Sequence, residues 1–381
     1  MKILIAPQTF KGSISALEVA KAMREGTERV ITGADIVLIP VADGGDGTLE
    51  TLVEASGGKV RTATVTGPLG QPLTTQWGAM GDGNTAVIEM ARTSGLALVP
   101  VEMRNPLITT TFGLGEAIQH GLKEGYRKFI IGIGGSATND AGAGMAQALG
   151  IRLLSKDGID LPFGGAALSR LDQIDISGLD KLARESEFMV ACDVNNPLTG
   201  PEGASVVYGP QKGANSDMIE ELDSALEHFA NVVKRDIGVD IGKIPGSGAA
   251  GGLGAGLIAF LGGKLRAGVD IVLDAVDFDN RLTGANLVIT GEGSLDHSTI
   301  YNKAPVGVAR LAKAKGIPVI AISGSLGEGF QEIYNYGIDA VSAITPGPMT
   351  LEAASSNAFR LISNAAEESL RFMKLGGRVF S

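Results

Sequence analysis

Residues 132–140 read Gly132-Ile133-Gly134-Gly135-Ser136-Ala137-Thr138-Asn139-Asp140. The apolar residues 129–133 predict a buried strand before the loop, and residues 144–149 predict the beginning of a helix after it. Glycines between a strand and a helix N-terminus let backbone N–H groups approach an anion closely, and the helix dipole favours negative charge there. We therefore interpret residues 134–139 as a phosphate-binding loop, with a tight, N-capped turn as the alternative.

Strand-like and helix-like segments alternate at both ends of the chain. The predicted strands cover residues 3–6, 36–40, 287–290, 319–323 and 340–344. The predicted helices cover residues 16–23, 47–55, 304–314 and 351–372. Strands separated by helices of this length form parallel, doubly wound sheets. Both ends of the chain are therefore expected to share one such sheet.

The middle of the chain breaks this alternation. Residues 60–66, 73–80 and 85–90 predict three successive strands, and Gly81-Asp82-Gly83-Asn84 predicts a hairpin turn between the last two. Antiparallel strands of this kind indicate that a second domain begins near residue 60. We therefore predict an α/β fold with a discontinuous, flavodoxin-like parallel-sheet domain, residues 1–59 and 285–381. A second α/β domain, residues 60–284, is inserted into it.

Composition and charge exclude several classes of protein. The net charge of −10 argues against nucleic-acid binding, which requires a basic surface. The single cysteine, Cys192, excludes an internal disulfide and fits a reducing compartment. No stretch reaches the roughly 20 apolar residues of a membrane span, and residues 1–7 enter a strand directly instead of forming a signal peptide. We therefore expect a cytoplasmic protein with no membrane partner.

Five further loops place polar side chains where parallel strands are expected to end, which is where open α/β sheets bind ligands. These loops carry Lys11, Asp43 and Asp46, Asp193 and Asn195, Lys212, and finally Glu292, Asp296 and Lys303. Taken singly, each has an ordinary alternative, such as a solvated lysine at position 11 or a helix cap at position 46. Residues 246–251 match the dinucleotide pattern G-x-G-x-x-G, but the polar segment 236–245 before them is a poor strand.

Several long motifs occur together and in order. They include IAPQTFKGSISALEVA (residues 5–20), PVADGGDGT (40–48), GIGGSATNDAGAGM (132–145), CDVNNPL (192–198), YGPQKGA (208–214) and TGEGSLDHSTIYNKAPVGVA (290–309). On these motifs the chain resembles the type-1 family of bacterial glycerate kinases over close to its full length. The resemblance implies two α/β domains with a cleft between them and ATP-dependent phosphorylation of D-glycerate with Mg²⁺, usually to 2-phosphoglycerate.

The matching positions suggest a role for each polar residue. We expect Asp193, Asp296, Lys11 and Lys303 to be catalytic, and Asp43, Asn195 and Glu292 to bind the substrate. We expect Gly134, Gly135, Ser136, Thr138, Asn139 and Lys212 to bind ATP, and Asp46 and Asp140 to bind Mg²⁺. Within these roles, either Asp193 or Asp296 is the acceptor of the hydroxyl proton. The sequence does not determine the oligomeric state, and both a monomer and a homodimer are compatible with it.

Some positions depart from the family pattern. Gln8 stands where the family usually has Asp, and Asp46 where it has Glu. Ser294, Ser298 and Asn302 replace an Arg, a Gln and a Gly. Gln8, Ser294 and Ser298 leave open a kinase of another small hydroxy acid. Two further alternatives are 3-phosphoglycerate as the product and a non-catalytic sugar-acid-binding protein. A nicotinamide-dependent dehydrogenase is a fourth and depends on the weak motif at residues 246–251.

Overall fold

The structure is a computed structural model that describes residues 1–45, 47–301 and 303–379. The chain has an α/β fold with parallel sheets and divides into two compact units. Unit 1 contains residues 1–43, 50–55 and 269–381, and unit 2 contains residues 44–49 and 56–268. These units are defined by contacts within the chain. The domain boundaries expected from the sequence remain a prediction. No helix of the described residues is both long enough and apolar enough to cross a membrane.

Unit 1 is built on a five-stranded parallel sheet with the order β13-β12-β11-β1-β2. Its strands are β1 (Lys2–Pro7), β2 (Asp35–Leu38), β11 (Leu287–Leu295), β12 (Val319–Leu326) and β13 (Ala340–Ala343). Counted within the unit, this order is 2-1-3-4-5, which is the flavodoxin-like order with its switch point between β1 and β11. The register pairs Ile3 with Leu287 and Ile5 with Ile289, and all four side chains are buried.

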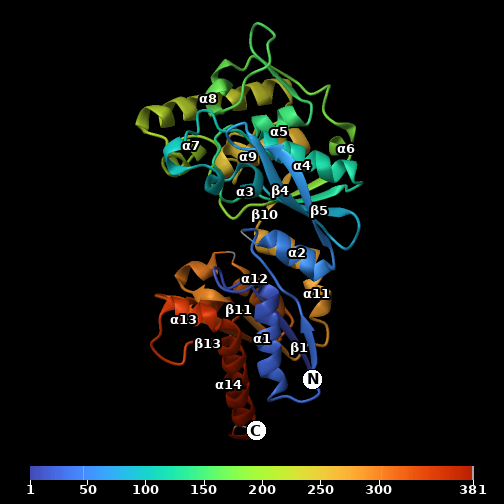
Figure 1. The fold of residues 1–381 in the computed structure, drawn as a ribbon, viewed down its shortest axis with the longest axis vertical. Helices are drawn as coiled ribbons and strands as arrows, with labels where there is room; N and C mark the ends of the chain where they lie inside the picture. The colour runs from blue at the N-terminus through green and yellow to red at the C-terminus, as the bar shows by residue number, and fades with distance from the viewer. Residues whose placement is uncertain (46, 302, 380–381) are drawn as a thin grey trace. The chain divides into compact units, whose positions relative to one another are not determined.

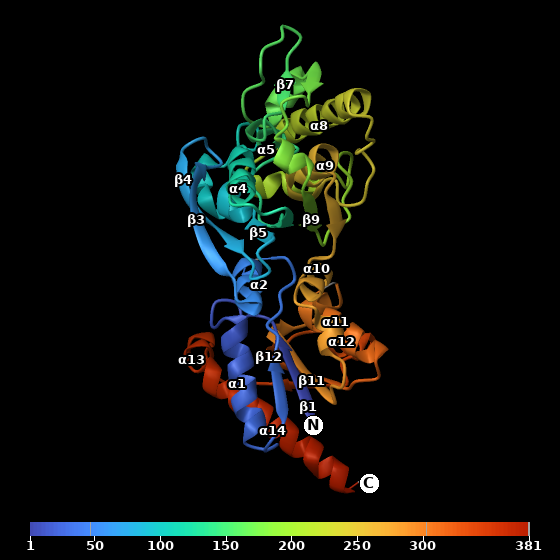
Figure 2. The ribbon, with the colours of Figure 1, turned by 90° about the vertical axis from the view of Figure 1, so that its right-hand side faces the viewer.

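Helices cover this sheet on two faces (Figures 1 and 2). The helices of the unit are α1 (Ala16–Glu28), α11 (Phe278–Arg281), α12 (Ala304–Ala314), α13 (Leu351–Ser356) and α14 (Ala358–Val379), and α2 (Thr48–Ser56) and α10 (Gly268–Ala275) begin at the unit boundary. Helices α1 and α14 pack side by side, and a Cβ at Gly26 would lie 2.0 Å from the Ser363 carbonyl oxygen. Glycine at this position therefore allows the two helices to approach closely.

Two elements of unit 1 differ from the sequence expectations. The helix predicted over residues 351–372 is two helices, because the Thr350 side chain caps α13 and that helix ends at Asn357. Strand β11 continues five residues beyond Thr290, because Ser294 and Leu295 still pair with Ser325 and Leu326 of β12. Glu292 therefore lies within a strand and not in the loop that follows one.

Unit 2 is built on a six-stranded mixed sheet with the order β10-β9-β6-β5-β4-β3. Its strands are β3 (Lys59–Thr66), β4 (Pro72–Ala79), β5 (Thr85–Glu89), β6 (Lys128–Gly132), β9 (Glu187–Ala191) and β10 (Lys264–Arg266), with a separate pair β7 (Arg152–Leu154) and β8 (Gln173–Asp175). The first three strands are antiparallel, as predicted, and β5, β6, β9 and β10 are parallel. Asp82 closes the predicted hairpin by accepting hydrogen bonds from the Asn84 and Thr85 N–H groups (both 2.9 Å).

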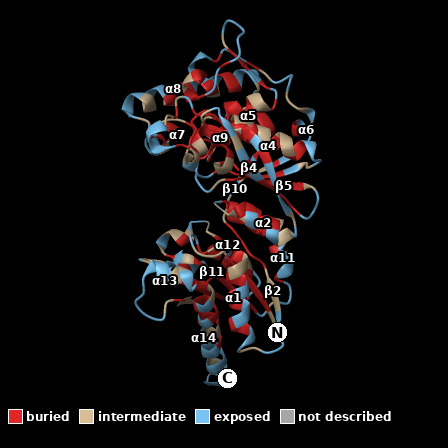
Figure 3. Cartoon of the chain, in the orientation of Figure 1, coloured by how far each residue is buried: buried red, intermediate tan, exposed pale blue. Residues whose placement is uncertain are grey.

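The helices of unit 2 enclose one large apolar core with the sheet. They are α3 (Ala91–Ser94), α4 (Phe112–Lys123), α5 (Ala143–Ala148), α6 (Lys181–Arg184), α7 (Ala204–Tyr208), α8 (Ser216–Asp236) and α9 (Ala249–Leu261). Buried residues concentrate on the strands and on the inner sides of these helices (Figure 3). Strand β6 is in the middle of the sheet, between β5 and β9, so the loop that leaves its carboxyl end is anchored on the core.

Candidate active site

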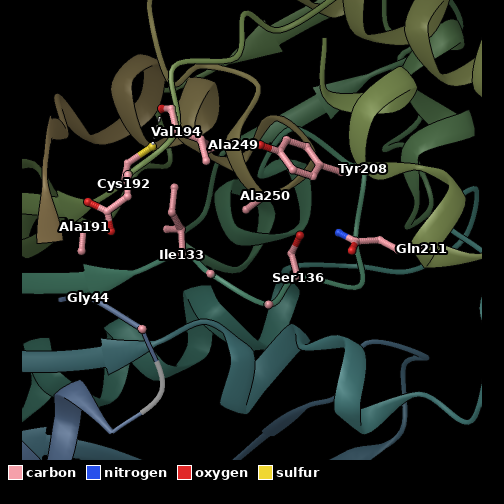
Figure 4. Close-up of a pocket in the computed structure, with 14 residues that line it drawn as sticks. Gly44, Ile133, Ser136, Ala191, Cys192, Val194, Tyr208, Gln211, Ala249 and Ala250 are labelled. Atoms are coloured by element: carbon pink, nitrogen blue, oxygen red, sulfur yellow. Dashed lines mark hydrogen bonds between the residues drawn. The ribbon is translucent and has the colours of Figure 1, made fainter. Parts of the chain in front are cut away.

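A cavity of about 280 Å³ opens at the carboxyl ends of β6 and β9 in unit 2. Its walls come from the loops after these two strands, from the region of α7, from the beginning of α9, and from two glycines. The lining residues are Gly44, Gly45, Ile133, Gly134, Gly135, Ser136, Ala191, Cys192, Asp193, Val194, Tyr208, Gln211, Ala249 and Ala250. Figure 4 shows the Gln211 side chain reaching toward Ser136 across this cavity.

The glycine loop after β6 presents backbone to this cavity. Gly134 and Gly135 are exposed, and Gly135 has a φ of 73°, a conformation that glycine adopts without strain. Two backbone hydrogen bonds hold this loop to the segment that contains α3. The Leu96 N–H donates to the Gly135 carbonyl (2.8 Å), and the Ala137 N–H donates to the Ser94 carbonyl (3.0 Å). The loop is therefore ordered without using the faces of Gly134 and Gly135 that line the cavity.

Asp140 is not placed as the predicted metal ligand. Its side chain is fully buried, and burial raises its pKa against the effect of its hydrogen bonds. Oδ2 accepts hydrogen bonds from the Thr111 N–H (2.9 Å), the Thr111 hydroxyl (2.8 Å) and the Gly144 N–H (3.2 Å), and Oδ1 accepts one from the Gly142 N–H (3.2 Å). The carboxylate holds the loop to the N-terminal ends of α4 and α5, so both oxygens are already engaged by the protein.

Thr138, Asn139 and Lys212 also differ from their expected placement, since they lie beneath the cavity and do not line it. The sequence predicts a turn that presents Lys212 to ATP, but this side chain is only 1% exposed. Its ammonium group donates to the Thr138 carbonyl oxygen (2.7 Å). Burial lowers the pKa of Lys212 to about 7, and the nearby Asp140 charge opposes this shift.

The loop after β9 contributes one acidic side chain to the cavity. Asp193 lines it, and its Oδ1 accepts a hydrogen bond from the Gly268 N–H (3.0 Å). Asn195 is exposed and is not among the lining residues. The Cys192 thiol contacts the Val194 carbonyl (3.3 Å), and burial raises its pKa. Among the side chains of described residues that line the cavity, Asp193 is the charged one.

A second group of predicted residues gathers in unit 1 at the end of β11. Glu292 is buried, and its Oε1 accepts a hydrogen bond from the Thr299 hydroxyl (2.9 Å). Burial raises the pKa of Glu292 to about 7; the charges of Asp43 and Asp296 act in the same direction, and Lys303 acts against it. Four of the predicted residues are therefore close enough to interact electrostatically.

Asp296 has the opposite character to Glu292. It caps the short 3₁₀ helix His297–Ile300, and its Oδ1 accepts hydrogen bonds from the Ser298 hydroxyl (2.5 Å) and the Ser298 N–H (2.7 Å). The hydroxyl bond lowers the pKa of Asp296, so its carboxylate stays ionised. Ser298, one of the departures from the family pattern, therefore holds the carboxylate in its charged form.

Lys11 is placed by a tight turn after β1. Its side chain is exposed and lines a separate cavity of about 280 Å³ in unit 1, together with Phe10, Gly293, Gly324 and Ser325. This cavity is at the carboxyl end of the flavodoxin-like sheet, close to the switch point. Asp46 and Asn302, which the sequence analysis also singled out, lie outside the described residues.

Sequence reasoning missed several residues that support the site. Thr111 donates twice to Asp140, and the Ser205 hydroxyl accepts a hydrogen bond from the Asn139 amide (3.0 Å). Glu89 at the end of β5 is buried, accepts from the Leu49 N–H (2.9 Å) and pairs with Arg92 (2.6 Å). Glu89 carried a usable signal, because it is an acidic residue near the end of the strand predicted over residues 85–90. A lone Ser or Thr in a polar segment carries none.

The donor chemistry of the site is compatible with Mg²⁺. Among the described residues, no three His, Cys, Asp or Glu side chains cluster into a metal site. Mg²⁺ prefers oxygen ligands and is commonly held by one or two carboxylates together with substrate phosphates. The Asp193 carboxylate lines the same cavity as Gly134, Gly135 and Ser136, so it fits such a shared site.

Comparisons with known proteins agree with this reading. The model of the glycerate kinase family matches residues 3–374. The chain is 51% identical over 380 residues to a glycerate kinase of Bacillus subtilis, covering 100% of both chains. It is 48% identical over 378 residues to a glycerate 2-kinase of Escherichia coli, covering 99% of both. A solved structure of a glycerate kinase 2 from Salmonella typhimurium LT2 matches with a TM-score of 0.93 at 49% identity, covering 100% of both chains. With a family model over residues 3–374 and relatives of this similarity, the chain belongs to the glycerate kinase family and is a kinase.

Proposed function

We propose that this protein transfers the γ-phosphoryl group of ATP to D-glycerate and releases 2-phosphoglycerate. The observation that carries the proposal is the glycine loop after β6, whose exposed backbone lines a cavity beside Asp193. The substrate follows from the relatives, and the position of phosphorylation from the Escherichia coli relative, which is named glycerate 2-kinase.

In unit 2 the cavity binds the phosphate groups. Gly134, Gly135 and Ser136 hold phosphate oxygens through backbone N–H groups and one hydroxyl. Asp193 would hold Mg²⁺, and the ion would supply positive charge to offset that of the phosphates. Ile133, Val194 and the ring of Tyr208 contribute apolar surface to the walls of this cavity.

In unit 1 the carboxylate cluster handles the hydroxy acid. Glu292 accepts the proton of the attacking hydroxyl, since a base works best with a pKa near the working pH. We prefer Glu292 to Asp193 or Asp296 for this role, because the lowered pKa of Asp296 makes it a weaker base and Asp193 lines the cavity assigned to the phosphates. Asp43 binds a glycerate hydroxyl group in this cluster, and Lys11 and Lys303 offset the negative charge of the substrate.

The reaction is tested by ³¹P NMR of the purified protein with ATP, Mg²⁺ and D-glycerate. A new phosphomonoester signal that matches 2-phosphoglycerate is the expected result. A signal that matches 3-phosphoglycerate would retain the kinase and overturn the proposed position. If ATP stays intact with D-glycerate but is consumed with another small hydroxy acid, the proposed substrate is wrong.

A further inference from the structure

A buried ammonium group connects two walls of the phosphate cavity. Lys212 Nζ donates to the Thr138 carbonyl oxygen at 2.7 Å, and the two residues are 1% and 0% exposed. Lys212 belongs to the short 3₁₀ helix Pro210–Lys212 that follows α7, whereas Thr138 belongs to the loop after β6. The contact therefore joins segments 74 residues apart in the chain.

A second buried bond joins the same two segments. The Asn139 side-chain amide donates to the Ser205 hydroxyl of α7 at 3.0 Å, and both residues are fully buried. We name these two bonds, Lys212–Thr138 and Asn139–Ser205, the buried clamp. The two bonds start from neighbouring residues of the loop and end at opposite ends of the α7 region. They therefore restrain the loop and the α7 region from moving apart and from sliding along each other.

The clamp lies directly behind side chains that line the cavity. Thr138 follows Ser136 by two residues, and Lys212 follows Gln211 by one. Ser205 precedes Tyr208 by three residues, which is close to one turn of α7. In Figure 4, Ser136 and Gln211 face each other across the cavity. A shift at the clamp would therefore move both residues that narrow the cavity.

The lysine end of the clamp is fixed in its own segment. The Lys212 N–H donates to the Gly209 carbonyl (2.9 Å), and Gly213 follows with a φ of 93°. A Cβ at Gly213 would lie 2.4 Å from the Arg104 carbonyl oxygen, so the turn packs tightly against that segment. Backbone contacts on both sides therefore fix the point from which the Lys212 side chain extends to Thr138.

Stability alone does not explain a lysine at this position. Transfer of an ammonium group from water into the protein interior is unfavourable, and a methionine of similar length would avoid that loss. In this interior position the ammonium group donates a hydrogen bond to the loop that lines the cavity. We propose that Lys212 and Asn139 are positioning residues that set the distance between the glycine loop and the α7 wall for nucleotide binding. This inference depends on the proposed assignment of the cavity to ATP.

The test uses Lys212→Met, which keeps the length of the side chain and removes its hydrogen bond. Lys156→Met is the matched control, because Lys156 is an exposed lysine of the same unit. We expect the KM for ATP to rise roughly 10- to 100-fold in Lys212→Met, as for other small misplacements of binding groups. The KM for D-glycerate and all constants of Lys156→Met should stay at wild-type values.

Hydrogen–deuterium exchange separates positioning from general destabilisation. In Lys212→Met the amides of residues 134–136 should exchange faster, while those of β7 and β8 in the same unit should not change. An unchanged KM for ATP, or faster exchange throughout unit 2, would overturn the clamp. If Lys212→Met does not fold, Ser205→Ala decides the matter: a smaller rise of the same KM supports the clamp, and no rise overturns it.

Failure of the clamp can be distinguished from failure of the proposed function. If the wild-type protein does not bind ADP in calorimetry, the assignment of the cavity to nucleotide is wrong. If the wild type binds ADP and Lys212→Met binds it with the same affinity, the assignment stands and the clamp is wrong.

Discussion

At the scale of single residues, Glu292 is the carboxyl group whose protonation the proposed reaction depends on. Because its pKa is raised to about 7, a base at this position is protonated and inactive below pH 7 and becomes active above it. We expect kcat of the wild type to rise with pH through an apparent pKa near 7. Glu292→Gln should lower kcat by roughly 10²- to 10⁴-fold and remove this acid limb. A pH–rate profile of both proteins checks this, and an unchanged acid limb in Glu292→Gln would exclude the role.

Lys212 gives a second prediction at this scale, on stability. The pKa of Lys212 is about 7 in the folded protein, whereas the usual pKa of a lysine is 10.5. Between pH 7 and pH 10.5 this group therefore binds fewer protons in the folded protein than in the unfolded chain. Stability contributed by this group therefore rises with pH across that window. The free energy of unfolding of the wild type, relative to Lys212→Met, should increase from pH 7 to pH 9 in urea titrations. An equal difference at both pH values would contradict a buried lysine.

At the scale of elements, Asp140 connects the loop after β6 to the beginnings of α4 and α5. Thr111→Val keeps the shape of the side chain but removes the hydroxyl that donates to Asp140 and accepts from the Met145 N–H (3.0 Å). We expect a loss of about 1–3 kcal/mol in the free energy of unfolding, because buried partners are left without a bond. Thr64→Val on the exposed side of β3 is the control and should stay within about 0.5 kcal/mol of the wild type.

The contact between α1 and α14 gives another prediction at this scale. Gly26→Ala would place a Cβ 2.0 Å from the Ser363 carbonyl oxygen, so the helices must separate. Thermal unfolding should show a loss of about 1–3 kcal/mol. Gly376→Ala, also in a helix of unit 1, meets no atom within 4 Å and should be neutral or stabilise by up to about 1 kcal/mol. Equal effects of the two substitutions would contradict the close approach.

Sequence patterns predicted strands and helices well where the signal lies within a few residues of the element. The strands β3, β4 and β5 with their hairpin follow from alternation and from Gly-Asp-Gly-Asn, and both signals are within a few residues of one another. The length of β11 did not follow, because its last residues are held by pairing with β12 and not by their own propensity. Lys212 was misplaced for a similar reason: only the packing of residue 138, far away in sequence, shows that the side chain is buried.

At the scale of the whole molecule, charge works against the proposed nucleotide. The net charge is −10, and among the described residues that line the cavity assigned to the phosphates, Asp193 is the charged one. Salt screens repulsion between like charges, with a Debye length of about 10 Å at 0.1 M. We therefore expect the KM for ATP to fall as NaCl increases from about 20 to about 200 mM at saturating Mg²⁺. Steady-state kinetics check this, and a KM that rises steeply with salt would indicate attraction by cations instead.

The sequence also led to the architecture of the whole chain, through different means for its two parts. Alternating strands and helices at both ends predicted the parallel sheet of unit 1, and the antiparallel strands marked the change to another unit. The sequence could not predict which of the polar loops lie close together in the folded protein. Glu292, Asp43, Asp296 and Lys303 come together through the order of strands in one sheet, whereas Thr138 and Lys212 come together through the packing of loops.

The pairing of β1 with β11 has a consequence for the synthesis of the chain. The apolar residues 3–6 leave the ribosome early, but their partner residues 287–290 follow more than 280 residues later. At about 5–20 residues per second, this interval lasts on the order of 15 to 60 s. All strands of the unit 2 sheet are synthesised within that time, before β11 is made. Until β11 is synthesised, β1 can pair with β2, but its other edge has no partner strand.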